Sequence, residues 1–231
     1  MKISKKQKEI QKAYQKNKDY SLMDAINVLK KAPKANFDES VDLCMSLNID
    51  SKKVTQPIRG TVALIHGTGK KVSVCCICKG EDETKATEAG ADHVGADNLI
   101  AKIAGGWVDF DVCVATPEMM REMAKLGKVL GPKGLMPNPK SGTVTMDVAK
   151  AVREIKAGKI EYKMDKLAAI HVAIGKLSFE ANKIFENVSD FIGAVISANA
   201  PVSKPNAIKS IFLSKTMGPG IKLDINEFKK S

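Results

Sequence analysis

The sequence has no long apolar run, and no stretch approaches the roughly 18 residues that a membrane-spanning helix requires. Its first residues, MKISKKQKEIQKAYQKNK, contain neither the apolar core of a signal peptide nor the arginines of an organellar transit peptide. The five cysteines are odd in number and irregularly spaced, which is typical of a chain kept in a reducing compartment. Together these absences predict a cytoplasmic protein without a membrane span.

Motifs for catalysis and for metal binding are also absent or incomplete. The three histidines, His66, His93 and His171, fall in three separate predicted elements, and neither G-x-S-x-G nor H-E-x-x-H occurs. Cys75 and Cys78 form a C-x-x-C pair within an apolar strand, where an offset of three residues directs them to opposite faces. We interpret both as buried core residues, and we predict no metal, no cofactor and no enzymatic activity.

The stretch HGTGK (66–70) carries the glycines and the lysine of a phosphate-binding loop. However, the pattern G-x-x-x-x-G-K-[ST] is missing, and a strand is predicted where a phosphate loop needs the first turn of a helix. A crossover between strands of two domains is the favoured interpretation. An enzyme or nucleotide-binding protein that uses the ends of a parallel sheet is the alternative, although the glycine-rich fingerprint is absent.

Positive charge is what the sequence has in excess. It contains 37 lysines and arginines against 26 acidic residues, a formal net charge of +11. This balance favours an anionic partner, either a nucleic acid or a membrane surface. Residues 4–18 hold six of the lysines and suit a solvated basic helix. That helix has too few apolar residues for strong insertion into a membrane, so nucleic acid is the favoured partner.

Hydrophobic periodicity divides the chain into three regions. ESVDLCMSLNI (39–49) alternates apolar and polar residues, which predicts a half-buried strand. The middle region alternates apolar strands with helices, which predicts parallel βαβ units covered on both faces. Half-buried patterns return after residue 160. We therefore predict a mixed α/β and α+β fold, in which a discontinuous α+β domain of residues 1–67 plus 160–231 is interrupted by a Rossmann-like α/β domain of residues 68–159.

The same patterns place the individual elements. Helices are expected within 21–32, 81–89, 97–104, 147–158 and 180–198, with another that opens at Pro117. Strands are expected at 58–65, 71–78, 91–95 and 110–116, and hairpins over 159–175 and 208–226. The stretch LGKVLGPKGLMPNPKSGTV (126–144) is predicted to be the longest irregular element. Its three prolines favour a rigid, functional loop, and a solvated surface loop is the alternative.

This loop resembles the signature of the bacterial L-one family of large-subunit ribosomal proteins. Further stretches follow in the family's order and extend the resemblance over nearly the whole chain from about residue 20: FDESVDL, IRGTVALIHGTGK, GADHVG, GGWVDFDVCVATPEMM, REIKAGKIEY, AIHVAIGKLSF and SKTMGPG. The resemblance implies a monomer when free that joins the large ribosomal subunit. It also implies binding to the stalk of 23S rRNA, near the exit-site tRNA, and to the leader of its own operon mRNA.

The resemblance further implies that the discontinuous domain recognises RNA, through Phe37, Ser40, Ser210, Thr216, Met217 and Gly218, with additional candidates at Glu39, Lys166 and His171. We expect the Thr216 hydroxyl to meet a ribose 2′-OH or a phosphate, and Met217 to pack on a sugar or base. Gly218 is expected to let RNA approach the backbone. Phe37 would either support this surface or pack in the core. The sequence departs from the family's usual residues at Asn36, Pro57, Ile65 and Lys215.

Overall fold

The computed structural model describes residues 14–15, 18–33, 35–48, 58–198 and 207–228. Most of the predicted basic helix (4–18) and the departure at Pro57 therefore lie outside the described residues. The chain divides into two compact units, Met1–Gly69 with Glu161–Ser231, and Lys70–Ile160. The expected domain boundaries, after residue 67 and before residue 160, lie close to these limits.

The first unit contains an antiparallel sheet of four strands in the order β7-β1-β8-β9. The strands are β1 (Ser40–Leu47), β7 (Ala169–Lys176), β8 (Ile208–Lys215) and β9 (Ile221–Lys222). Strands β2 (Arg59–Ala63) and β6 (Lys159–Lys163) form a separate two-stranded sheet. Strand β1 pairs with both β7 and β8, and its strict alternation gives it one fully apolar face.

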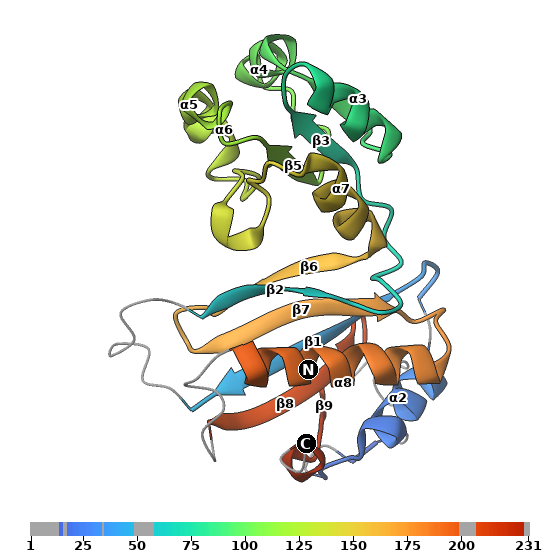
Figure 1. The fold of residues 1–231 in the computed structure, drawn as a ribbon. Coiled ribbons are helices and arrows are strands. Elements are labelled where there is room, and N and C mark those ends of the chain that lie inside the picture. Colours follow the sequence, from blue (N-terminus) through green and yellow to red (C-terminus); the bar gives the residue numbers. More distant parts are fainter. Residues whose placement is uncertain (1–13, 16–17, 34, 49–57, 199–206, 229–231) are drawn as a thin grey trace. The chain divides into compact units, whose positions relative to one another are not determined.

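Two helices provide the core of this unit. Helix α8 (Ala181–Ala198) lies across one face of the four-stranded sheet, and α2 (Leu22–Lys31) packs against α8 and β8 (Figure 1). As predicted, Ser21 caps α2, and its hydroxyl accepts a hydrogen bond from the Asp24 backbone N–H. The inward face of β1, Val41 to Leu47 at every second residue, is buried as the alternation predicts. The opposite face is only half-buried.

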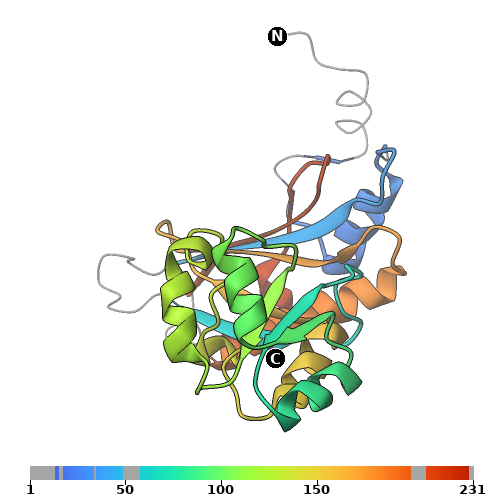
Figure 2. The ribbon, with the colours of Figure 1, turned by 90° about the horizontal axis from the view of Figure 1, so that it is seen from above.

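The second unit is a parallel sheet with the strand order β4-β3-β5. Its strands are β3 (Val74–Ile77), β4 (His93–Gly95) and β5 (Val112–Ala115). One face is covered by α3 (Glu81–Glu88) and α7 (Val148–Ala157), and the other by α4 (Asp97–Ala104) and α5 (Met120–Met123). Figure 2 shows the strands of this unit with helices on both sides (Figure 2). The mixed fold class with an internal parallel α/β block is thus confirmed.

The long stretch 126–144 is less irregular than predicted. It contains α6 (Gly127–Leu130) and a short 3-10 helix, η2 (Pro139–Ser141), and it begins at the last residue of η1 (Ala124–Leu126). Leu126 and Leu130 are buried in the core beneath β5. The end of the stretch runs beside β5, where the Ala115 N–H donates to the Thr143 carbonyl at 3.0 Å. The prediction of an irregular loop was wrong because the prolines and glycines indicated a loop, whereas Leu126 and Leu130 anchor the segment on the sheet.

The HGTGK stretch leads from β2 into β3, so a strand follows it and no phosphate-loop helix begins there. Gly67 and Gly69 both have positive φ, 62° and 71°. A glycine is required at position 69, where a Cβ would lie 2.9 Å from the Phe179 ring. The glycines therefore shape a crossover, as expected.

The cysteines of the parallel sheet are core residues, as predicted. Cys75 packs with the cluster on one face of β3, whereas Cys78 packs with the cluster on the other. All five cysteines are free thiols, and only Cys44, on β1, is partly exposed. Burial raises the pKa of Cys76 and of Cys78, which disfavours the reactive thiolate.

We predict that a maleimide modifies the cysteines of the folded protein at neutral pH in two kinetic classes. Cys44 is expected to react first. The buried thiols are expected to react at least about a hundredfold more slowly, because they become accessible only when the sheet opens. Mass spectrometry after timed quenching measures this, with protein in denaturant as the control in which all five cysteines react alike. Equal rates for Cys44 and Cys78 in the folded protein would contradict the prediction.

Candidate nucleic-acid interface

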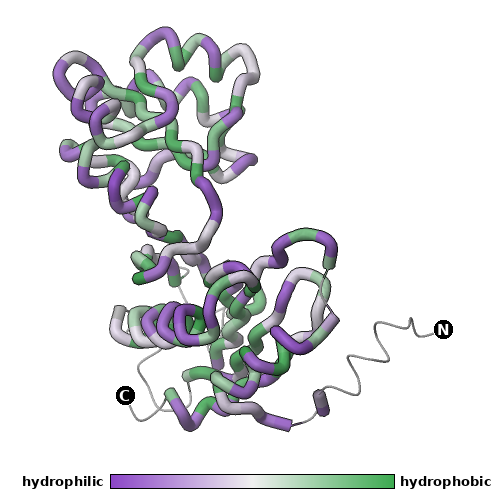
Figure 3. Tube along the Cα trace, turned by 90° about the vertical axis from the view of Figure 1, so that its right-hand side faces the viewer, coloured by the Kyte–Doolittle hydropathy of each residue, from purple (hydrophilic) through white to green (hydrophobic). Residues whose placement is uncertain are grey.

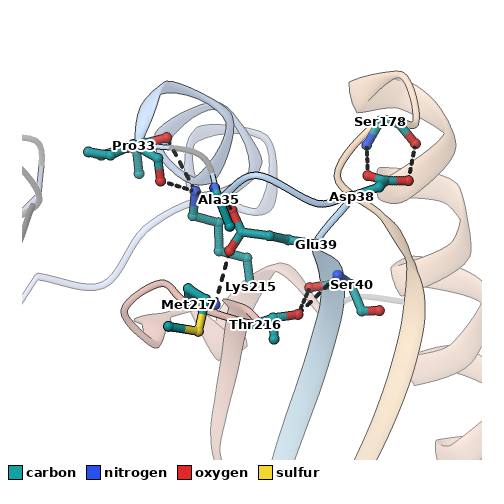
Figure 4. Close-up of polar contacts among 10 residues, drawn as sticks. Pro33, Ala35, Asp38, Glu39, Ser40, Ser178, Lys215, Thr216 and Met217 are labelled. Carbon is teal, nitrogen blue, oxygen red and sulfur yellow. Dashed lines mark hydrogen bonds and ion pairs between the residues drawn. The ribbon is translucent and has the colours of Figure 1, made fainter.

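The start of β1 and the turn after β8 meet at one end of the four-stranded sheet. The antiparallel register places Val41 opposite Lys215, so Ser40 lies beside Thr216 although 176 residues separate them in sequence. We call the surface formed by Phe37, Ser40, Thr216, Met217 and Gly218 the ledge; Figure 4 shows the polar contacts beneath and beside it (Figure 4). Five of the six principal candidates predicted from the sequence are thereby brought together.

The two large apolar side chains of the ledge face solvent. Phe37 is 56% exposed and Met217 is 68% exposed. Packing of Phe37 in the core, one of the two expectations for this residue, is therefore wrong. Hydrophilic and hydrophobic residues are interspersed along the chain trace of this unit (Figure 3). The segments that carry this ring and this thioether both donate a backbone hydrogen bond to the Glu39 carboxylate, so the two exposed side chains mark one candidate contact surface.

The hydroxyls of the ledge already have partners within the protein. The Thr216 hydroxyl accepts from the Ser40 backbone N–H at 3.1 Å and lies 3.4 Å from the Ser40 carbonyl oxygen. The Ser40 hydroxyl accepts from Nζ of Lys176 at 3.0 Å. Thr216 thus joins the turn to β1, and its hydroxyl hydrogen can turn from the Ser40 carbonyl to an incoming acceptor. The oxygen atoms of both hydroxyls are therefore held in place.

A buried ion pair lies below this surface. Nζ of Lys215 is 3.2 Å from Oε1 of Glu39, and neither side chain is exposed to solvent. The same ammonium donates to the carbonyl oxygens of Ala32 and Pro33 at 3.2 Å and 2.9 Å. A direct contact between Glu39 and RNA, expected from the resemblance, does not fit this burial. Lys215, which departs from the family's usual residue, therefore has all the partners of its ammonium inside the protein.

The Glu39 carboxylate also holds two backbone amides. The Ala35 N–H donates to Oε1 at 3.0 Å, and the Met217 N–H donates to Oε2 at 2.9 Å. Burial by itself raises the pKa of Glu39, but these two hydrogen bonds and the ion pair with Lys215 outweigh it, and the pKa is lowered overall. The carboxylate is therefore ionised at neutral pH.

Gly218 has a structural role besides the one expected from the resemblance. A Cβ at this position would overlap Cγ of Lys215 and would lie 3.0 Å from its Cε. The missing side chain therefore leaves room for the lysine below the turn. The expected close approach of RNA at Gly218 stays a prediction.

The remaining candidates lie away from the ledge. Ser210 pairs with Ser46, and His171 pairs with Cys44, so both lie on the outer face of the sheet, where Ser210 is half-buried and His171 is exposed. At 3.3 Å per residue, Ser46 is about 20 Å along β1 from Ser40. Lys166 is exposed in the turn before β7. The structure places none of these three residues in the ledge.

Two of the residues that depart from the family's usual pattern are exposed, and Asp38 fixes the segment that carries one of them, Asn36. Asn36 lies on the surface beside Phe37, and Ile65 is 67% exposed. The Asp38 carboxylate accepts from the Ser178 backbone N–H at 3.2 Å and from its hydroxyl at 2.8 Å (Figure 4). The backbone that carries Phe37 is therefore held on both sides, by Asp38 and by Glu39.

Sequence reasoning missed the supporting role of Glu39 and Lys215, although a signal was present. Both residues have the odd parity of the inward-facing positions, Val41 on β1 and Leu213 on β8. A charged residue in an inward position needs a partner of opposite charge. Parity thus indicated two buried charges.

Neither a membrane span nor a metal cluster is found in the structure where it is described. No helix among the described residues is both long and apolar enough to cross a bilayer. Likewise, over the described ranges, no three or more histidine, cysteine, aspartate or glutamate side chains gather as metal ligands would.

The chain matches known proteins over almost its full length. Residues 29–219 match the model of the ribosomal protein L1p/L10e family. A protein of Protochlamydia amoebophila named large ribosomal subunit protein uL1 is 49% identical over 97% of this chain and 95% of its own length. Proteins of the same name from Chlamydia caviae and Flavobacterium johnsoniae are each 50% identical, over 100% and 96% of this chain and 99% and 97% of their own lengths. The chain therefore belongs to the ribosomal protein L1p/L10e family.

Proposed function

We propose that this chain is a non-catalytic component of the large ribosomal subunit, in the cytoplasm, and that its discontinuous unit binds the stalk of 23S rRNA through the ledge. The observation that carries the proposal is the combination of exposed Phe37 and Met217 with the fixed hydroxyls of Ser40 and Thr216. A ring and a thioether can pack on a base or a sugar, and hydroxyls can bond a ribose 2′-OH. The names of the relatives support the same assembly.

The ledge itself is uncharged, whereas the chain carries a net charge of +11. Charge would therefore speed the encounter with RNA and supply salt-dependent affinity. Shape and hydrogen bonding at the ledge would supply the selectivity. This division of roles predicts that ledge substitutions and lysine substitutions affect binding differently.

The direct test is binding of the purified protein to a stalk fragment of 23S rRNA at moderate salt, measured by fluorescence anisotropy. A random RNA of equal length is the control. Selective binding of the stalk fragment is the expected result. Equal affinity for both RNAs would overturn the proposal.

Met217→Ala is expected to weaken binding of the stalk fragment by about 1–3 kcal/mol, because a packed side chain at the centre of an interface is lost. Affinity for random RNA should not change. Met146→Ala is the matched control, because Met146 is similarly exposed, at 73%, in the other unit. The same loss for both variants would contradict the assignment of Met217.

Thr216→Val is expected to weaken the same complex by about 1–3 kcal/mol, because the Ser40 N–H and the RNA both lose a partner. Thr216→Ser keeps the hydroxyl and should retain most of the affinity. Thr87→Val, on the exposed surface of α3, controls for loss of a threonine hydroxyl elsewhere. If serine and valine weaken binding equally, the hydroxyl does not contribute.

We further propose, from the family alone, that the same ledge binds a similar fold in the leader of the chain's own operon mRNA and represses its translation, and that on the ribosome it assists release of exit-site tRNA. Competition between the stalk fragment and the leader tests the first of these. Mutually exclusive binding is expected, and simultaneous binding would place the leader on another surface.

A further inference from the structure

The three segments that form the ledge converge on the ion pair of Lys215 and Glu39. The first segment, residues 35–39, is attached through the Ala35 N–H to Oε1 of Glu39. The turn after β8 is attached through the Met217 N–H to Oε2 of the same carboxylate. Residue 40 follows Glu39 directly at the start of β1. A single carboxylate therefore positions the backbone on both sides of the ledge.

Lys215 holds that carboxylate from below. Its ammonium has three acceptors: Glu39 Oε1 and the carbonyl oxygens of Ala32 and Pro33, at the end of α2. Three donors and three acceptors leave this buried ammonium fully bonded. The end of a helix also favours a cation, because its carbonyls carry a partial negative charge. The ammonium thus connects α2 to Glu39.

The aliphatic part of Lys215 supports the turn mechanically. It fills the space that a Cβ at position 218 would take, and the Gly218 N–H donates to the Lys215 carbonyl at 2.9 Å. The backbone between Met217 and Gly218 consequently rests on the lysine stem. Lys215 therefore supports the position of the turn after β8 through its stem and the orientation of the Glu39 carboxylate through its ammonium.

We propose that Lys215 is a positioning residue for RNA recognition, which acts through Glu39 and Gly218 to hold the ledge in its binding geometry before RNA arrives. The inference rests on the proposed function of the ledge. Buried ion pairs contribute little net stability compared with apolar residues of similar size, but they fix geometry when every donor and acceptor is bonded. A surface fixed in advance loses less conformational entropy on binding.

The decisive variant is Lys215→Met combined with Glu39→Gln, which removes both charges and keeps the approximate volumes. We expect about a tenfold loss of affinity for the stalk fragment, since the gain from preorganisation is removed. Binding of random RNA and the salt dependence of binding should not change, because neither residue is exposed. Lys209→Met, an exposed lysine on the same strand, is the matched control.

Hydrogen exchange separates positioning from general stability. In the double variant the Met217 amide should exchange faster, whereas amides in the centre of β1 keep their protection, because only the support of the turn has been removed. Gly218→Ala supplies a second test. It should weaken stalk binding in the wild-type background. In a Lys215→Ser background it should cause no further loss of stalk binding, because the lysine stem no longer occupies the space.

The outcomes are distinguishable. If the wild-type protein binds stalk and random RNA equally, the proposed function fails. If the wild type is selective but the double variant binds the stalk fragment within about twofold of it, a change of under about 0.4 kcal/mol, the positioning role is wrong. Should the double variant not fold, Gly218→Ala is decisive, because it displaces the Lys215 stem and keeps both charges, and unchanged binding of the stalk fragment by this variant would overturn the positioning role.

Discussion

Replacing Lys215 alone by methionine is expected to lower the free energy of unfolding by about 3–5 kcal/mol, because the substitution leaves the Glu39 carboxylate buried without its cation. Methionine keeps most of the volume below Gly218, so the loss reports on charge more than on packing. The carbonyls of Ala32 and Pro33 also lose a donor. Denaturation by urea at neutral pH, followed by circular dichroism, measures the change.

The pH dependence provides the control for this interpretation. The pKa of Glu39 in the folded protein is lowered below its ordinary value of 4.5, so its ionised form contributes stability above that value. This contribution is lost as the pH falls through the lowered folded pKa. Without Lys215 the buried carboxylate protonates more readily, so the difference between wild type and Lys215→Met should narrow as the pH falls from 7 towards 4. A constant difference would contradict the charge-based explanation.

Asn187→Leu is expected to lower the free energy of unfolding by about 2–4 kcal/mol, because three backbone groups lose their partner. Asn187 on α8 is fully buried. Its amide group donates to the carbonyls of Gly67 and Ile174, both at 3.0 Å, and its oxygen accepts from the His66 N–H at 3.1 Å. This one side chain attaches the HGTGK crossover to the helix and to β7.

Asn182→Leu is the matched control, since Asn182 is exposed near the start of the same helix. Its effect should stay within about 0.5 kcal/mol. Urea denaturation of both variants, followed at the same wavelength, gives the comparison. Similar effects at positions 182 and 187 would show that the crossover does not depend on this side chain.

Patterns with a short period predicted the local structure well. The alternation from Val41 to Leu47 is the buried face of β1, and the apolar run around Cys75 is a strand buried on both faces. Both patterns are repeated over several residues, and each residue needs only its own neighbours to be interpreted. The stretch 126–144 was predicted less well, because its buried apolar residues, Leu126 and Leu130, lie among prolines and glycines that are typical of loops.

The sequence could not show how the ledge is supported. The motif SKTMGPG marked the turn as unusual, and the family resemblance named its residues. The partners of Lys215 and Met217 lie near the other end of the chain, at Pro33 and Glu39. Which partner each residue meets depends on the register between β1 and β8. A shift by one residue would have turned Lys215 to the outer face.

The sequence by itself determined the basic charge, the two kinds of sheet and the family, because these follow from composition, periodicity and ordered motifs. Only the tertiary structure decided which residues are exposed for contact and which are buried as supports. Phe37 and Met217 face solvent, whereas Glu39 and Lys215 lie beneath them. The physical reason is that burial of a charge depends on a partner of opposite charge, and antiparallel pairing of distant strands brought that partner within reach.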